Sequence, residues 1–309
     1  MPVKYKIIAS TLAVLLTLST GASATANVST ITLKDFPVPR YGIETKLIGK
    51  PRIVALANGS MEVLYALGVE RYVVGRDIAS NFQAVKRIPT VTNGHAISAE
   101  KLLKFKPTII LADKNSGPAK ALEVIKRSGV KVAVIPEAYS IPMMASKYRA
   151  IIKAINLGEK SAPAEKLLAS IPPLKMETAS SNLRVAFFYL RGSSSIYLMG
   201  GKGSGADGII EAAGGLDVGA EMGLPAFVPI TSEAVLTADP AILLVMKKGV
   251  QSVGGSEGLQ KLPGIAQIVK KRDRKVVAVD DSLLLSFGPR TSDLIENLRK
   301  ILESISKNI

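Results

Sequence analysis

Two stretches of this 309-residue sequence match each other without a gap: ISAEKLLKFKPTIILA at residues 97–112 and ITSEAVLTADPAILLV at residues 230–245. Each predicts a short helix that begins at a hydroxyl-bearing N-cap, Ser98 or Thr231, and is followed by a proline and a buried strand. Because the same helix–strand unit occurs in both halves at one register, the sequence predicts two pseudo-symmetric lobes.

Around both stretches, short apolar strands alternate with helical segments, which is typical of a mostly parallel sheet with helices on both faces. Residues 143–172 contain no strand and predict one long helix that ends at Pro172 and Pro173. We therefore expect two Rossmann-like α/β lobes joined by one long linking helix, with a ligand cleft between them. The expected divisions are a signal peptide (1–26), an N-terminal extension (27–49), an N-terminal lobe (50–142), the linking helix (143–172) and a C-terminal lobe (173–309).

The first 26 residues have the composition of an export signal. Lys4 and Lys6 precede an apolar run over residues 7–19, and the small residues of GASATA offer cleavage after Ala24 or Ala26. The run is too short to span a bilayer by itself, and an uncleaved anchor is the alternative. We expect an exported protein, periplasmic or at the cell surface. Because the chain has no cysteine, we expect neither a disulfide nor a lipid anchored through a cysteine.

The sequence carries 40 lysines and arginines against 25 acidic residues, which gives a formal net charge of +15. We expect no nucleic-acid partner, because the chain is exported and only 5% of its residues are aromatic, too few for a base-stacking surface. The cations are scattered rather than striped, which favours a protein that works near an anionic membrane surface.

Two short motifs resemble cofactor or catalytic sites but lack the context that such sites need. GSGADG at 203–208 fits G-x-G-x-x-G, yet no strand ending in an acid follows at the spacing of a dinucleotide site. GGSEG at 254–258 fits a nucleophile elbow, yet no strand runs directly into its serine and no histidine follows it. One histidine and no cysteine also disfavour a zinc or manganese site. The sequence thus favours a binding protein over the alternative of an enzyme acting on a bound tetrapyrrole or sugar.

Four further stretches carry a resemblance to a known family: GRDIASNF (75–82), VTNGHAISAE (91–100), KKGVQSVGGSEGLQKLPG (247–264) and SFGPRT (286–291). They resemble the substrate-binding proteins with a rigid linking helix that serve ABC importers of haem, siderophores and cobalamin, and among these the haemin-binding HmuT type. The resemblance covers about residues 50–309. It implies that the protein captures ferric haem and delivers it to an ABC permease and its ATPase, with a haem donor protein as a further partner. A siderophore or cobalamin receptor of the same fold is the alternative.

The resemblance also implies the iron ligands. The family's histidine falls on His95, its tyrosine on Tyr189 in FFYLRG, and its arginine on Arg191. Imidazole and tyrosinate are both axial ligands of haem iron, and a nearby cation such as Arg191 favours the phenolate or pairs with a haem propionate. Arg290 is a second candidate for a propionate. Other haem-binding relatives carry a tyrosine at the position of Asn93, so no such ligand is expected there.

Glu100 and Glu233 are matched acidic residues of the two repeated stretches. Each is predicted in the first turn of its helix, where the helix dipole stabilises a carboxylate. The resemblance implies a second role, because one acidic residue per lobe of these proteins docks onto arginines of the permease. Two carboxylates on separate lobes would fix the orientation of the docked protein. Glu62 is a further candidate for this role.

Overall fold

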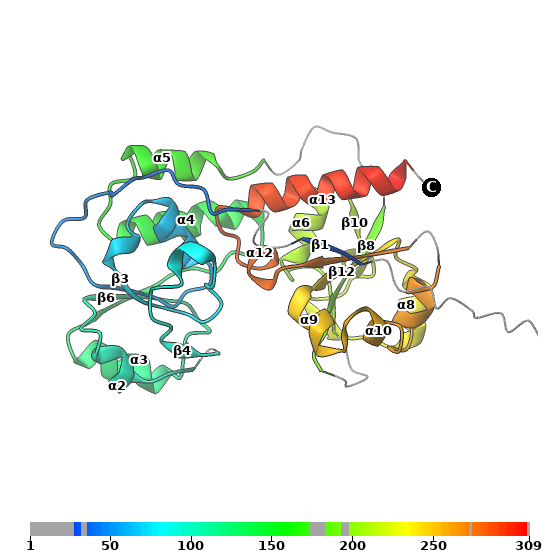
Figure 1. Ribbon diagram of the computed structural model, residues 1–309, viewed down its shortest axis with the longest axis horizontal. Coiled ribbons are helices and arrows are strands. Elements are labelled where there is room, and N and C mark those ends of the chain that lie inside the picture. Colours follow the sequence, from blue (N-terminus) through cyan, green and yellow to red (C-terminus); the bar gives the residue numbers. More distant parts are fainter. Residues whose placement is uncertain are drawn as a thin grey trace, which may run out of the picture.

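The computed structural model describes residues 28–31, 36–94, 96–173, 183–192, 198–271 and 274–307. It has two α/β lobes side by side, as predicted (Figure 1). The first lobe is built on a parallel four-stranded sheet in the order β3-β2-β6-β7. Its strands are β2 (Ile53–Ala55), β3 (Val73–Arg76), β6 (Ile109–Ala112) and β7 (Lys131–Val134), and a separate hairpin pairs β4 (Thr92–Asn93) with β5 (Ala96–Ile97). Its helices are α1 (Ser60–Ala66), η1 (Glu70–Tyr72), η2 (Gln83–Val85), α2 (Ala99–Leu103) and α3 (Ala119–Arg127).

The second lobe is built on a seven-stranded sheet in the order β1-β13-β12-β8-β9-β11, with β10 also paired to β8. Strand β9 runs antiparallel to both of its neighbours, β8 and β11, and the other strand pairs are parallel. The strands are β1 (Val28–Ile31), β8 (Arg184–Tyr189), β9 (Leu198–Gly200), β10 (Leu216–Asp217), β11 (Phe227–Pro229), β12 (Ile242–Met246) and β13 (Lys275–Val279). The helices are α6 (Ala206–Ala212), α7 (Val218–Glu221), α8 (Ser232–Ala238), α9 (Lys247–Ser252), α10 (Gly255–Leu259), α11 (Ile265–Val269), α12 (Asp281–Leu284) and α13 (Thr291–Ser306).

The repeated helix–strand unit folds alike in both lobes. The Ser98 hydroxyl accepts a hydrogen bond from the Lys101 backbone N–H at 3.4 Å, and the Thr231 hydroxyl caps α8 in the same way. Lys106 and Asp239 both take a left-handed backbone, with φ of 48° and 36°, directly before a proline. A residue that precedes proline avoids the right-handed helical region, so neither helix continues through this position. The predicted pseudo-symmetry therefore extends to individual backbone angles.

The predicted single linking helix is wrong, because the segment forms two helices, α4 (Ile141–Ala154) and α5 (Ala162–Ala169). Asn156 takes a left-handed backbone with φ of 54°, and the Leu157 N–H reaches back to the Ile152 carbonyl at 3.1 Å. Asparagine tolerates this conformation and often ends a helix. Pro163 then stands in the first turn of α5, where a missing N–H costs nothing.

The N-terminal segment connects the two lobes. Strand β1 lies at the edge of the second-lobe sheet, where it pairs in parallel with β13 (Figure 1). Farther along, the Tyr41 N–H donates to the Ala66 carbonyl at 2.7 Å and the Thr45 N–H donates to the Gly68 carbonyl at 3.0 Å, both in the first lobe. The expected N-terminal extension is thus divided between the lobes. Among the described residues, no helix is both long and apolar enough to cross a membrane.

The buried side chains form one large apolar cluster that contains residues of both lobes, and one smaller cluster on the outer face of each sheet. Each strand contributes side chains to the shared cluster and to the outer cluster of its own sheet, because successive residues of a strand point to opposite faces. In β6, Ile109 and Leu111 join the shared cluster, whereas Ile110 faces α2 and α3. The two lobes are therefore packed together through a common core.

Candidate functional site

A cavity of about 190 Å³ lies at the carboxyl edge of the first-lobe sheet. In open α/β sheets, ligands bind in the loops outside the carboxyl ends of the strands. The lining residues follow β2, β3, β6 and β7 or belong to the β4–β5 hairpin: Leu56, Asn58, Asp77, Ile78, Ala79, Thr92, Gly94, Ile97, Asp113, Asn115, Ser116 and Glu137. The cavity therefore has the position expected for one wall of a ligand site.

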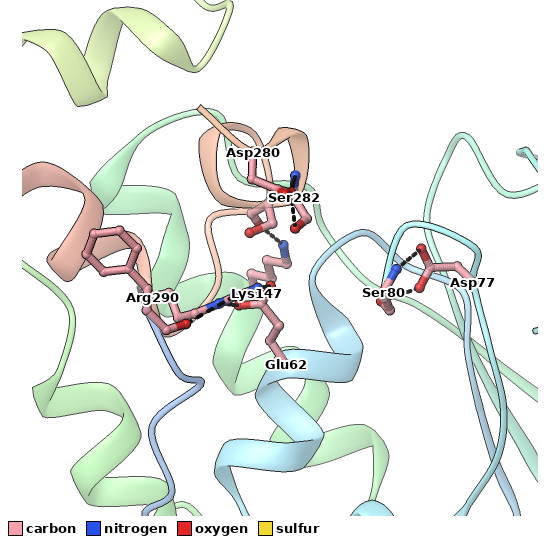
Figure 2. Close-up of polar contacts among 9 residues, drawn as sticks. Glu62, Asp77, Ser80, Lys147, Asp280, Ser282 and Arg290 are labelled. Atoms are coloured by element: carbon pink, nitrogen blue, oxygen red, sulfur yellow. Dashed lines mark hydrogen bonds and ion pairs between the residues drawn. The ribbon is translucent and has the colours of Figure 1, made fainter. Parts of the chain in front are cut away.

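The carboxylates of this wall are already held by their own loops. Asp77 accepts hydrogen bonds from the Ala79 N–H and from the N–H and hydroxyl of Ser80, and its burial raises the carboxyl pKa (Figure 2). Asp113 accepts one from the Asn58 N–H at 2.8 Å. These acids order the loops and give the wall a negative character.

Sequence reasoning missed these acids, and it also missed Lys114, which follows Asp113 two residues after the end of β6. Its ammonium lies 2.9 Å from the Glu137 carboxylate and 4.8 Å from the centre of the Tyr139 ring. The Tyr139 hydroxyl donates to the same carboxylate. A lysine just after a buried parallel strand was the available signal, since such positions face the ligand edge of a sheet.

The matching wall of the second lobe is aromatic. Tyr189 is the last residue of β8, and its ring meets the ring of Phe227 edge-on at 5.8 Å between centres. The guanidinium of Arg191 lies 5.7 Å from the centre of the Tyr189 ring. Phe227 is 39% exposed, which is high for a phenylalanine on a strand. The end of β8 thus offers a phenol, a cation and an apolar ring together.

His95 lies outside the described residues. Its neighbours Asn93 and Ala96 are register partners in the β4–β5 hairpin, and Gly94 lines the first-lobe cavity. Thr92, Gly94 and Ile97, which flank the histidine in the sequence, line that cavity. The expected meeting of His95 and Tyr189 on one ligand stays a prediction.

Arg290 does not suit the propionate role that we expected of it. It is 2% exposed, and its guanidinium makes two contacts with the Glu62 carboxylate, Nε to Oε2 at 3.1 Å and Nη2 to Oε1 at 2.5 Å (Figure 2). A third donor, Nη1, reaches the Phe36 carbonyl at 3.3 Å. Glu62 is 3% exposed, so it does not suit permease docking either. The pair instead ties α1 of the first lobe to the start of α13 in the second.

The comparisons with known proteins agree with this geometry. A model of the family described as periplasmic binding protein matches residues 53–283. The chain belongs to the periplasmic binding protein family. This membership agrees with the expectation of a binding protein rather than an enzyme.

Three similar periplasmic binding proteins are informative. The solved periplasmic heme-binding protein RhuT from Roseiflexus sp. RS-1 is 32% identical with a TM-score of 0.75, and the match covers 84% of this chain and 100% of that one. The heme binding protein HmuT is 26% identical with a TM-score of 0.71, over 90% of this chain and 97% of that one. An uncharacterized ABC transporter substrate-binding lipoprotein, YvrC of Bacillus subtilis (strain 168), is 25% identical over 264 residues, 82% of this chain and 79% of its own.

The solved HmuT structures include variants in which a histidine, a tyrosine or an arginine is replaced by alanine. That tyrosine and arginine are two positions apart, as Tyr189 and Arg191 are in this periplasmic binding protein. The spacing agrees with the carry-over of the two residues that the sequence resemblance implied.

The two acidic residues expected to dock are on the surface of this periplasmic binding protein. Glu100 has an 81% exposed side chain and an ion pair with Lys104 at 3.1 Å, one helical turn away. Glu233 is likewise exposed in the first turn of α8. Both positions leave a carboxylate at the start of a capped helix, accessible to a partner.

Lys147 of α4 is fully buried between the lobes of this periplasmic binding protein, where its ammonium donates to the Ser286 carbonyl at 2.6 Å (Figure 2). Burial lowers the Lys147 pKa to about 8. Between pH 8 and the ordinary lysine pKa of 10.5, the unfolded chain holds a proton that the folded chain has lost, so stability due to this group rises with pH.

We therefore expect the natural protein to gain about 2 kcal/mol of unfolding free energy relative to Lys147→Met between pH 7.5 and pH 10. Urea unfolding of both proteins at each pH measures this difference. Parallel stability curves for the two proteins would contradict the lowered pKa.

Proposed function

We propose that this protein captures ferric haem between its two lobes and delivers it to an ABC permease and its ATPase. The observation that carries the proposal is the pair of Tyr189 and Arg191 at the carboxyl end of β8, with Phe227 against the phenol. Similar proteins are named as heme-binding, and HmuT has been varied at a tyrosine and an arginine with the same spacing.

The chemistry of these residues suits ferric haem. A phenolate is a hard anionic oxygen donor, and tyrosine is a known axial ligand of haem iron. The guanidinium of Arg191, 5.7 Å from the centre of the Tyr189 ring, is placed to pair with a haem propionate. Phe227 offers an apolar surface for the porphyrin. His95, which lies outside the described residues, is the proposed second ligand.

The charges of the two walls also favour one orientation of the haem. The propionates are anions, and the first-lobe wall carries the carboxylates of Asp77, Asp113 and Glu137. Like charges at short range in a cleft repel each other. We expect the propionates to point away from these acids, toward Arg191.

The proposed setting is outside the cytoplasm. Membership of the periplasmic binding protein family and the similarity to an ABC transporter lipoprotein support export. The leader over residues 1–26 lies outside the described residues, and its proposed cleavage after Ala24 or Ala26 stays a prediction. Peptide sequencing of the exported protein's N-terminus would locate the cut.

An absorbance titration with ferric haem tests the proposal. The chain lacking residues 1–26 is expected to saturate stoichiometrically with a sharp Soret band. Tyr189→Phe and His95→Ala are each expected to shift that band and to weaken binding at least about tenfold, because each removes an axial ligand. Tyr148→Phe is the matched control, since the buried Tyr148 hydroxyl has no hydrogen-bond partner among the described residues.

Two outcomes would contradict the proposal. A weak, unsaturated signal from every protein would mean that haem is the wrong ligand, and a siderophore or cobalamin would be titrated next. Product formation from haem during the titration would indicate an enzyme. Unchanged spectra in Tyr189→Phe alone would reject only the assignment of that ligand.

A further inference from the structure

The loop over residues 42–50 exposes two large apolar side chains. Ile48 is 88% exposed and Ile43 is 83% exposed, more than any other large apolar side chain among the described residues. Single exposed apolar residues are common and need no explanation. Two of them within six residues, on one loop, form a local apolar tip.

The loop is held in this conformation by hydrogen bonds to the first lobe. The Arg71 guanidinium donates to the carbonyls of Glu44 at 3.1 Å and Thr45 at 3.3 Å. The Leu47 N–H donates to the Tyr72 hydroxyl at 3.1 Å, and the Leu47 side chain is buried. Because Thr45 and Leu47 are anchored inward, the side chains between and beside them are left facing the solvent.

Cations surround this tip. A hollow of about 530 Å³ beside the loop is lined by Lys46, Leu47, Lys50, Pro51, Arg52, Arg71, Tyr72 and Val74, without a carboxylate among these residues. Of the nearby acids, Glu70 is paired with Arg40 at 2.5 Å, and Glu44 is exposed on the loop. Cations thus outnumber acids on this surface. We call Ile43, Lys46, Ile48, Lys50, Arg52 and Arg71 the basic patch.

The basic patch is separate from the ligand cavity. Arg52 directly precedes β2 and Tyr72 directly precedes β3, so the patch lies at the amino edge of the first-lobe sheet, whereas the cavity lies at the carboxyl edge. The Arg52 guanidinium also donates to the Phe105 carbonyl at 2.8 Å, just beyond the end of α2. A change in the patch is therefore not expected to alter ligand binding.

We propose that the basic patch docks the protein on the surface of an anionic lipid bilayer. Apolar side chains beside cations are the combination that interfacial membrane binding uses, since the apolar groups enter the acyl boundary and the cations meet the headgroup phosphates. Two exposed isoleucines would contribute nothing to the binding of a soluble anion. The excess of cations on the chain, +15 in net formal charge, acts in the same direction.

Co-sedimentation with lipid vesicles tests the proposal. The chain from residue 27 contains every described element and lacks the apolar run of the leader, which would bind lipid by itself. We expect it to bind vesicles of phosphatidylcholine with about 30% phosphatidylglycerol at low salt, and to be released by 0.5 M NaCl, which screens surface charges. Vesicles of phosphatidylcholine alone are expected to bind little protein.

Two double variants separate the contributions of charge and apolar contact. Lys46→Gln/Lys50→Gln is expected to lower the partition coefficient about tenfold or more, because each lysine near an anionic surface contributes severalfold. Ile43→Ser/Ile48→Ser is expected to lower it about tenfold. Lys120→Gln/Lys126→Gln on α3 makes the same charge change at exposed positions of the same lobe and is expected to keep most of the binding.

Several results would overturn the proposal. These are the absence of binding to the anionic vesicles, equal binding to neutral vesicles, or an equal loss in the α3 control. Release by millimolar inorganic phosphate at constant ionic strength would indicate a soluble-anion site instead. The haem titration of each variant, expected to be unchanged, shows that the protein is folded and keeps this test independent of the proposed ligand.

Discussion

Replacing Arg290 by methionine is expected to lower the free energy of unfolding by about 3–5 kcal/mol, because it leaves a buried carboxylate without its partner. Glu62 is 3% exposed, and among the described residues Arg290 is the cation that hydrogen-bonds to it, whereas the Lys147 ammonium donates to Ser286. The Phe36 carbonyl loses a donor as well. Urea unfolding followed by circular dichroism measures the loss.

Two further variants show whether this loss comes from the buried charge. Glu62→Leu/Arg290→Met removes both charges and is expected to recover most of the stability, since apolar groups of similar volume replace such pairs well. Arg299→Met breaks ion pairs with Glu296 and Glu303, whose side chains are 37% exposed on α13, and is expected to cost much less than Arg290→Met because these carboxylates stay in contact with water. If Arg290→Met costs no more than Arg299→Met, the pair does not hold the lobes together.

Reversing the charge of both glutamates that we expect to dock, Glu100 and Glu233, is expected to reduce ligand delivery to the permease about 100-fold or more, with ligand binding unchanged. Glu100→Lys/Glu233→Lys would place a cation at the start of each capped helix, facing the permease arginines that the proposed docking requires. Like charges brought together at an interface cost several kcal/mol and suppress the encounter. Uptake of haem by permease reconstituted in vesicles measures the effect.

A matched variant controls for the change in net charge. Glu123→Lys/Glu211→Lys alters one exposed glutamate on each lobe, on α3 and α6, and adds the same number of positive charges. It is expected to deliver haem normally. If both double variants lose delivery equally, docking depends on overall charge, and the two capped helices have no special part in it.

The sequence predicted the parts of the fold that local signals specify. The units beginning at Ser98 and Thr231 each contain a cap, an amphipathic helix, a proline and an apolar strand, so each could be predicted without knowledge of the rest. The longer strands of both sheets were found for the same reason, because their apolar runs are bounded by turn residues, whereas the short or isolated strands β1, β10 and β11 were not. The surface positions of Glu100 and Glu233 follow from the first turns of those helices.

Other features have no local signature. The ion pair of Glu62 and Arg290 joins residues 228 apart, and neither stretch of sequence indicates the other. For this reason Arg290 was expected in the cleft, although its burial gives it a structural role. The end of α4 at Ala154 could have been found, since an asparagine just after a helix, here Asn156, is a recognised helix stop. This signal was overridden in the prediction because the helical pattern of apolar residues resumes after it and extends to residue 171.

The pairing of β1 with β13 has a consequence for how the protein matures. Strand β1 leaves the export channel near the start of the chain, but its partner, Lys275–Val279, is about 250 residues farther along. The first-lobe sheet needs only segments between Ile53 and Val134 and can assemble early. The β1–β13 edge of the second sheet can form only after almost the whole chain has been exported. A product truncated before β13 would therefore expose an unpaired strand, by which chaperones and proteases outside the cytoplasm could distinguish incomplete chains from finished ones.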